Sequence, residues 1–235
     1  MDVLLRIEAC GRQIDFGVAT TRAERTAVLA QRFRVYQRHG YYRPGLTVDH
    51  DEYDGKAVYL AATLRKDRPT AVLLGSARLI VGTPDPHFRF PSQRAFRFDL
   101  PEAVREMSVC QCLEVTRLVS ERPEGILPGG LLVPLGLIQT VSEYSQQHAI
   151  RCGLAVVKQR LLRTLLVAGV PLPEIAGARL IYPENGPTAP YYHRHADPVI
   201  PAWWSVAELA PLAAKAIARW CHASSSIKAP AFVLP

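Results

Sequence analysis

The sequence predicts an α/β fold with a mixed central sheet, and three features of the 235-residue chain indicate it. First, residues 57–64 and 71–81 suit two neighbouring antiparallel strands, after a weakly alternating stretch, residues 1–18, that suits a strand or hairpin around Gly11. Second, the later half alternates helix-like and strand-like segments. Third, residues 113–119 lie between the halves and form an apolar run typical of a buried strand, which nevertheless carries two charged residues.

A helix is predicted directly after the N-terminal stretch. Thr21 and Glu24 have the spacing of a capping box, and Gly40 supplies the usual C-terminal breaker, so the helix should end near residue 39. Helical spacing places Arg32 within an otherwise apolar stripe, one turn before Tyr36.

Residues 41–54 predict a functional loop, because they combine aromatic, Pro, Gly and acidic residues. Their acidic residues do not follow the EF-hand spacing, and we expect no metal site. Gly75, inside a predicted strand, indicates a bulge or a close backbone approach. Residues 83–105 are Pro-rich and aromatic and suit a flap over a cleft.

The second half predicts two helix–strand units and a final helix. The expected segments are a helix at 131–148, a strand at 153–157, a helix at 158–168, a strand at 175–182 and a helix at 206–222. Because no repeat, linker or shift in composition divides the chain, we expect one domain over residues 1–235.

Composition narrows the possible partners. The net charge of +7 favours an acidic partner, but the basic residues form no run, which disfavours nucleic acid. The five cysteines contain no CxxC pair and suit reduced thiols. Since neither a signal peptide nor an apolar run of membrane-spanning length is visible, we expect a cytoplasmic protein without integral membrane association.

The two charges of the central strand are the first candidates for chemistry. Strand alternation places Arg117 on the face of Val115 and Glu114 on the opposite face. An unpaired buried charge costs several kcal/mol, so both need partners. Residues 51–54 and 75–80 carry the charges that could supply them, and we expect these stretches to form one site.

These motifs, taken in order, resemble the acyl-homoserine-lactone synthases and their relatives, the N-acyl amino acid synthases, which both belong to the broad GNAT acyltransferase fold. The resemblance covers roughly residues 25–120, with a looser match to about 180. The matching residues are Arg32, Tyr36, Tyr42, Asp51, Asp54, Arg78, Glu114 and Arg117. The resemblance implies a single-domain GNAT-like fold in which two central strands splay apart between flanking helices.

The resemblance also implies an activity. The expected reaction is N-acyl transfer from a fatty acyl thioester on acyl carrier protein, an acidic partner, to the amine of an amino acid. No bound cofactor is implied; the acyl-phosphopantetheine thioester is a co-substrate, expected between the splayed strands 113–119 and 153–157. An autoinducer synthase that uses S-adenosylmethionine is the alternative within this fold. A non-catalytic binding protein that kept the fold is a third possibility.

The roles of individual residues follow from the same resemblance. Glu114 would take the proton of the acceptor amine, directly or through water, with Arg117 beside it. Together with Asp51, Asp54 and Arg78 they would form an ion-pair cluster over the cleft. Arg32 would join the cluster and bind the acceptor's carboxylate. Tyr36 and Tyr42 would line the acceptor or acyl pocket. A buried network that only ties helix and loop to the sheet is the alternative for these charges.

Departures from the homoserine-lactone synthases favour the N-acyl amino acid branch. Those enzymes usually have tryptophan at the position of Tyr42 and phenylalanine at that of Tyr36. The Gly-rich pyrophosphate loop of the GNAT fold is reduced to residues 125–130, in which Pro128 lacks a donor N–H. This change favours a carrier protein over acetyl-CoA. Residues 191–197, with two histidines, suit a surface loop or a contact with the carrier.

Overall fold

Seven strands form the central sheet of the computed structural model, which describes residues 1–9, 11–64, 71–121 and 130–226. The strand order is β1-β2-β3-β4-β6-β7-β9; β6 and β7 run parallel, and every other neighbouring pair is antiparallel. The strands are β1 (Asp2–Ala9), β2 (Arg12–Val18), β3 (Val58–Leu64), β4 (Val72–Val81), β6 (Cys112–Ser120), β7 (Cys152–Lys158) and β9 (Val199–Ser205), while β5 (Phe96–Arg97) and β8 (Arg179–Leu180) form a separate pair. The predicted α/β fold with a mixed sheet is confirmed.

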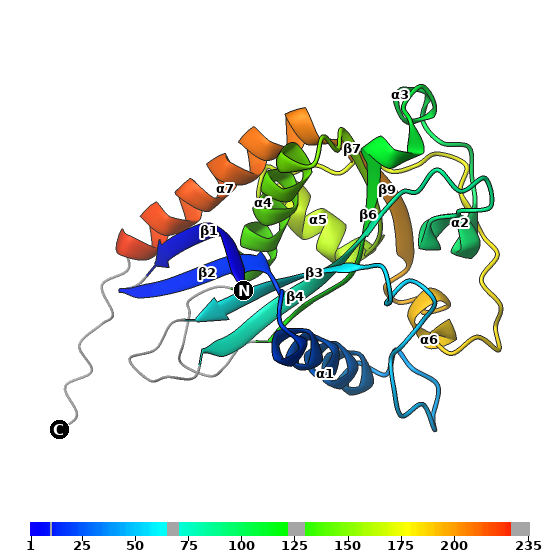
Figure 1. Ribbon diagram of the computed structural model, residues 1–235, viewed down its shortest axis with the longest axis horizontal. Helices are drawn as coiled ribbons and strands as arrows, with labels where there is room; N and C mark the ends of the chain where they lie inside the picture. Colours follow the sequence, from blue (N-terminus) through cyan, green and yellow to red (C-terminus); the bar gives the residue numbers. More distant parts are fainter. Residues whose placement is uncertain (10, 65–70, 122–129, 227–235) are drawn as a thin grey trace.

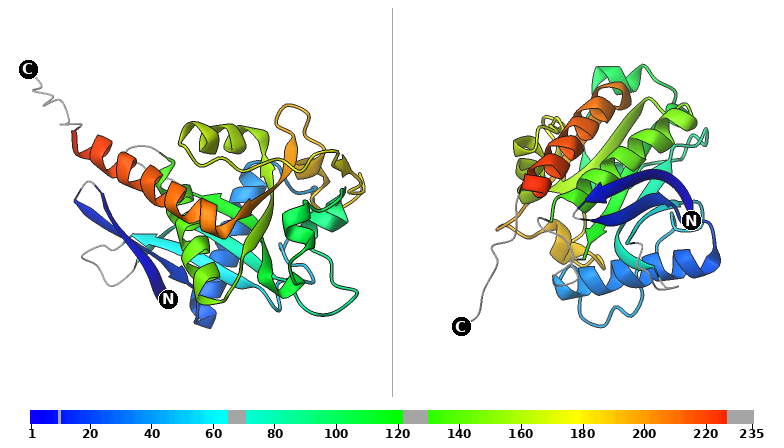
Figure 2. Two further views of the ribbon diagram at one scale, coloured as in Figure 1. Left: turned by 90° about the horizontal axis from the view of Figure 1, so that it is seen from above. Right: turned by 90° about the vertical axis from the view of Figure 1, so that its left-hand side faces the viewer.

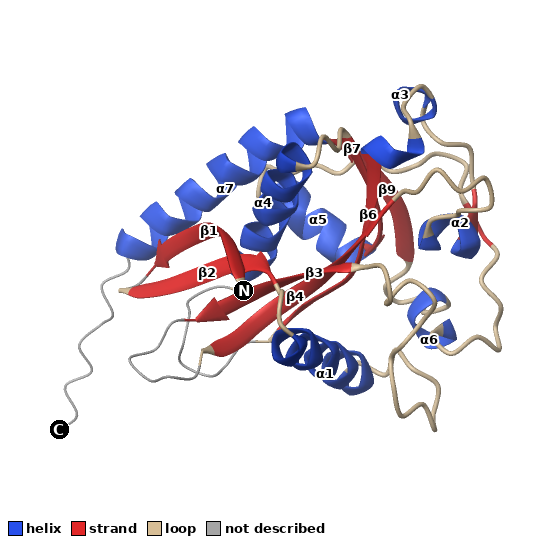
Figure 3. Ribbon diagram, in the orientation of Figure 1, coloured by secondary structure: helices blue, strands red, loops and turns tan. Residues whose placement is uncertain are grey.

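Helices cover both faces of this sheet (Figures 1 and 3). They are α1 (Arg22–Arg38), α2 (Pro91–Ala95), α3 (Glu102–Arg105), α4 (Leu132–Gln147), α5 (Gln159–Val167), α6 (Ala189–Tyr192) and α7 (Val206–Ser226), with a 3-10 turn at Val109–Gln111. The right-hand view of Figure 2 shows α4 and α7 side by side on one side of the sheet and α1 on the other. The main apolar core lies under α4 and α7, and a second, aromatic core joins α1 to α6.

Several elements were predicted correctly from local sequence signals. The Thr21 hydroxyl accepts from the Glu24 N–H at the start of α1, and Gly40 follows its end with φ 65°. Gly11 lies between β1 and β2 with φ 67°, which an L-residue seldom adopts. A Cβ on Gly75 would lie 2.6 Å from a Val133 methyl group, so the predicted close approach is confirmed.

In the later half one prediction was wrong and one strand was missed. Most of residues 175–182 is irregular, and only Arg179–Leu180 forms a strand, paired with β5. The edge strand β9 was not predicted; it contains Pro201, a residue that is unusual within a sheet. Proline is tolerated there because β9 pairs with only one full strand, β7, beside an isolated bridge from Glu174 to Ala202.

A bulge in β6 overturns the predicted alternation of the central strand. In the pairing with β4, Ser76 faces Val119 and Arg78 faces Thr116, so two residues of β6 stand opposite one of β4. Arg117 adopts φ 55° within this bulge. Its side chain therefore lies on the same side as that of Thr116, and not on the face of Val115 as alternation had placed it.

The two parallel strands separate directly before the bulge. Pairing between β6 and β7 covers Cys112–Val115 and Cys152–Ala155 and then stops. Beyond these residues β6 continues against β4 to Ser120, and β7 continues against β9 to Lys158. The splayed strands that the resemblance implied are thus present, and they open a gap in the middle of the sheet.

The left-handed backbone of Arg117 predicts that glycine is more stable than alanine at this position, the reverse of the usual order within a strand. Arg117→Ala keeps a Cβ in a conformation that costs L-residues about 1–2 kcal/mol, whereas Arg117→Gly relieves that cost. We expect the glycine variant to be the more stable by about 1 kcal/mol in urea unfolding. At the regularly paired Val115, the control, alanine should be the more stable. An alanine preference at both positions would contradict the bulge.

Candidate active site

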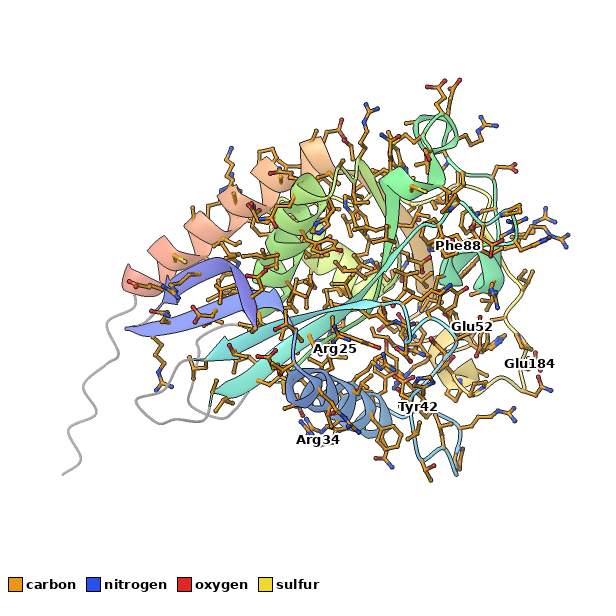
Figure 4. The ribbon with its side chains drawn as sticks, viewed as in Figure 1. Arg25, Arg34, Tyr42, Glu52, Phe88 and Glu184 are labelled. Atoms are coloured by element: carbon orange, nitrogen blue, oxygen red, sulfur yellow. The ribbon has the colours of Figure 1, made fainter. Side chains whose placement is uncertain are left out.

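Three arginines and three aspartates form a buried ion-pair cluster at the open side of the splayed strands. Arg32 of α1 donates to both carboxylate oxygens of Asp54, at 2.9 and 3.1 Å, and also pairs with Asp49. Arg78 of β4 donates to Asp54 at 2.7 Å and to both oxygens of Asp51, at 2.6 and 2.9 Å. The loop between α1 and β3 is thereby bound to the helix and to the sheet; Figure 4 labels Tyr42 and Glu52 in this loop.

Arg117 completes the cluster from β6. Its Nη2 lies 3.2 Å from Asp49 and 3.8 Å from Asp51, and its guanidinium carbon lies 5.1 Å from the centre of the Tyr36 ring. The bulge is what turns Arg117 toward these partners. The structure thus brings together five of the predicted site residues, Arg32, Asp51, Asp54, Arg78 and Arg117, and adds Asp49.

The predicted role of Arg32 needs correction. Its side chain is only 1% exposed, and its guanidinium is engaged by two carboxylates and the backbone oxygen of Asp49. A guanidinium with its donors directed at internal partners cannot also bind a substrate carboxylate. Arg32 therefore holds the loop in place. This agrees with the alternative stated for these charges, a buried network that ties helix and loop to the sheet.

The charges of the cluster stabilise one another. Burial alone would raise the pKa of Asp54, but the hydrogen bonds and charges of Arg32 and Arg78 outweigh it and hold that pKa well below its usual range. The Tyr59 hydroxyl adds a hydrogen bond of 2.7 Å. For Asp51, burial is likewise outweighed by Arg78, and its pKa is lowered.

We expect Asp54→Asn to destabilise the protein by about 3–5 kcal/mol, because it leaves two buried arginines without their shared carboxylate. The measurement is urea unfolding at pH 7 and at acid pH. Since the folded-state pKa is depressed, the stabilisation by Asp54 is present above the unfolded-state pKa and is lost as pH falls through the folded-state value. The difference between the two proteins should therefore narrow in acid. A loss below 1 kcal/mol at pH 7 would show that the cluster is not closed in solution.

Glu114 lies outside this cluster, contrary to the prediction. Its carboxylate, 0% exposed, accepts from the backbone N–H of Ser92 at 3.0 Å and from the Ser92 hydroxyl at 2.7 Å. Burial raises the pKa of Glu114 to about 7, although the bonds from Ser92 and the charge of Arg78 oppose the rise. The carboxylate thus ties the first turn of α2 to β6. Its role as the catalytic base stays a prediction.

The raised pKa predicts a pH-dependent effect of Glu114→Gln. In the wild type the neutral carboxyl is favoured by the fold, so its stabilisation is complete below the unfolded-state pKa and is lost as pH rises through about 7. The loss should reach about 3 kcal/mol. As the pH rises from 4.5 to 8, the free energy of unfolding of Glu114→Gln, measured in urea, should increase relative to that of the wild type by about this amount. The exposed Glu106→Gln is the control, and a parallel pH profile for the wild type and Glu114→Gln would contradict the raised pKa.

A cavity of about 890 Å³ passes between the splayed strands. On the side of α4, α5 and α7 its wall is apolar, formed by Ile138, Val141, Leu161, Leu165, Trp204 and Leu209. On the side of α1 and α6 it is aromatic and cationic, formed by Tyr36, Tyr41, Arg117, Lys158, Tyr191 and Arg194. One cavity therefore offers an apolar and a polar compartment, joined at the gap in the sheet.

The two predicted tyrosines have different places. Tyr36 lines the cavity, and its ring centre lies 5.3 Å from that of Tyr41 and 5.7 Å from that of Tyr191. Tyr42 is not among the lining residues; it packs behind Tyr36, at 5.4 Å, and against Phe33. The tyrosine that complements Tyr36 in the wall is thus Tyr41.

Sequence reasoning missed three residues of this region. Ser92, the partner of Glu114, lies in the stretch predicted as a flap and carried no distinctive signal. Tyr191 was assigned to a surface loop, but it is buried in the aromatic core. Lys158 was treated only as the start of a helix. A lysine that directly ends a buried apolar strand was the available signal.

Comparison with solved structures identifies the fold. The AHL synthase LasI superposes with a TM-score of 0.54 at 14% identity, over 82% of this chain and 89% of that chain. BjaI, a CoA-dependent acyl-homoserine lactone synthase with SAM and isopentyl-CoA, gives 0.54 at 20% identity, over 86% and 89%. FeeM, an N-acyl amino acid synthase from uncultured soil microbes, gives 0.51 at 13% identity, over 86% and 96%.

The chain therefore has the GNAT-like fold of the acyl-homoserine-lactone synthases and of an N-acyl amino acid synthase, as the resemblance implied. Neither a protein-family model nor a curated protein matches the sequence. No helix within the described ranges is both long and apolar enough to cross a membrane.

Proposed function

We propose that the protein is an N-acyltransferase that moves a fatty acyl group from an acyl-carrier-protein thioester to the amine of an amino acid. The observation that carries this proposal is the cavity between β6 and β7, with its apolar compartment on one side and its cationic, aromatic compartment on the other. An acyl chain fits the first compartment and a small polar acceptor fits the second. The thioester carbonyl would then lie at the gap, where the two substrates meet.

The gap suits the chemistry of aminolysis. The amine attacks the thioester carbonyl, the C–N bond forms, and the C–S bond breaks to release the carrier thiol. Backbone groups of β6 beyond Val115 and of β7 beyond Ala155 face the gap without a β-ladder partner across it. N–H groups among them could stabilise the developing oxyanion. Glu114, with a pKa of about 7, suits the general base, but its burial requires that the proton reach it through water.

Charge favours an acidic carrier. Among the residues that the structure describes, the lining of the cavity includes the five cations Arg117, Lys158, Arg160, Arg163 and Arg194 and one acidic side chain, Asp197. Arg160 and Arg163 project from α5 as exposed residues. The whole chain carries a net charge of +7. Such a surface attracts an acidic protein and orients its approach.

The test is mass spectrometry of lipid extracts from cells that express the protein together with a supply of acyl carrier protein. We expect new N-acyl amino acids, whose masses identify the acceptor and the chain length. Acyl-homoserine lactones in their place would establish the alternative, an autoinducer synthase that uses S-adenosylmethionine. If the folded protein yields neither product, the proposal fails and a binding protein of this fold is favoured.

The apolar compartment predicts the effect of filling it. Val141 of α4 is 1% exposed and lines this wall, so Val141→Phe should shorten the acyl chains found in the products by a few carbons. Val167→Phe, at a position 89% exposed on α5, makes the same change outside the cavity and should leave chain length unaltered. Unchanged chain lengths in a folded Val141→Phe variant would place the acyl group elsewhere.

A further inference from the structure

Lys158 is a buried cation in the cavity wall that the ion-pair cluster does not use. It is the last residue of β7, and α5 begins at the next residue, so its backbone is fixed at the edge of the gap. The residue is 8% exposed and lines the cavity on the side of the tyrosines. It was not among the residues that the sequence had indicated.

The ammonium group is held in a fixed position. Its Nζ donates to the backbone oxygen of Tyr191 at 2.6 Å and to that of Asp197 at 2.8 Å. It also lies 4.5 Å from the centre of the Tyr191 ring and 5.2 Å from that of the Tyr41 ring. An ammonium has three N–H donors, and two are used here. One N–H remains beside the cavity.

What Lys158 lacks is a counter-charge. Among the residues that the structure describes, no carboxylate lies within ion-pair distance of its Nζ, and the nearby Asp197 carboxylate accepts from the backbone N–H of Arg160. Arg32 and Arg78, which are also buried, each have two aspartates. Burial lowers the pKa of Lys158, the charge of Asp197 raises it and that of Arg194 lowers it, and together they bring the pKa to about 8. An anionic ligand would remove this deficit.

We propose that Lys158 binds the carboxylate of the acceptor amino acid and so makes the enzyme specific for acceptors that carry one. This inference rests on the proposed function. The compartment in which Lys158 lies distinguishes two possible anions, the carboxylate of the acceptor and the phosphate of the carrier. Lys158 shares the tyrosine-lined compartment with Arg117, whereas the acyl chain is placed in the apolar compartment.

The phosphate of the carrier fits Lys158 less well. That phosphate is separated from the thioester by the whole pantetheine arm, so it belongs near the exposed arginines of α5 and not in a buried compartment. In an amino acid, by contrast, one carbon separates the carboxylate from the amine. A carboxylate held by the Lys158 ammonium therefore keeps the amine close to the gap, where the thioester is placed. Lys158 also takes over the binding role that the buried Arg32 cannot perform.

The experiment compares two acceptors in two proteins. The wild type and Lys158→Met are given decanoyl-acyl carrier protein and either a mixture of the standard amino acids or the same mixture as carboxamides. Products are quantified by mass spectrometry at acceptor concentrations below saturation, where initial rates are proportional to kcat/KM. Lys215→Met, at an exposed position of α7, is the matched control.

We expect Lys158→Met to lower the rate with amino acids by about 10- to 100-fold, the usual effect of one charge-assisted hydrogen bond. The rate with the carboxamides should stay within about twofold, so that the preference for the carboxylate disappears. Lys215→Met should retain the wild-type preference. Lys158→Gln, which keeps a donor for the two carbonyl oxygens but removes the charge, replaces the methionine variant if the latter does not fold.

The other outcomes overturn the inference in separate ways. An equal loss with both kinds of acceptor would assign Lys158 to the donor thioester or to folding, and an unchanged preference would remove it from acceptor binding. A wild type that acylates neither mixture, although it is folded and supplied with donor, would refute the proposed function itself. Failure of the proposed function is thus distinguishable from failure of the role of Lys158.

Discussion

The ion pairs of Asp54 with Arg32 and Arg78 are the constraint on which the rest of the site depends. Each arginine is almost fully buried, and a buried guanidinium is tolerated only with carboxylate partners in good geometry. The three residues come from a helix, a loop and a strand that are far apart in the sequence. Their pairing therefore fixes the loop after α1 against the sheet, and the start of this loop, Tyr41, forms part of the cavity wall.

The cavity itself results from two irregularities of the sheet. The bulge at Arg117 turns β6 and accepts a left-handed backbone at a non-glycine residue. The antiparallel pairing of β7 with β9 draws β7 away from β6 after Ala155. A regular parallel pair would have filled this place with ladder hydrogen bonds and packed side chains. The cost of the bulge is offset by the charge pairs that Arg117 makes with Asp49 and Asp51.

Charge compensation separates the structural cations of this region from the one proposed to bind substrate. Arg32 and Arg78 have their carboxylates inside the protein, so they can hold elements together but can offer little to a ligand. Lys158 is also buried, yet its partners are neutral carbonyl oxygens and aromatic rings. All three are buried cations. The presence or absence of an internal counter-charge distinguishes the roles.

The sequence by itself determined the α/β fold, the capped first helix, and which charged residues would need partners. These signals are local or depend on the order of motifs along the chain, and Thr21, Gly40 and the run from Arg32 to Arg117 carry them. Only the tertiary structure decided how the charges pair. Alternation assumes a regular strand, so the bulge that turns Arg117 toward Asp49 was invisible, and so was the pairing of Glu114 with Ser92. The role of Lys158 was hidden for the same reason, because a missing counter-charge is a property of the space around a side chain and not of its neighbours in sequence.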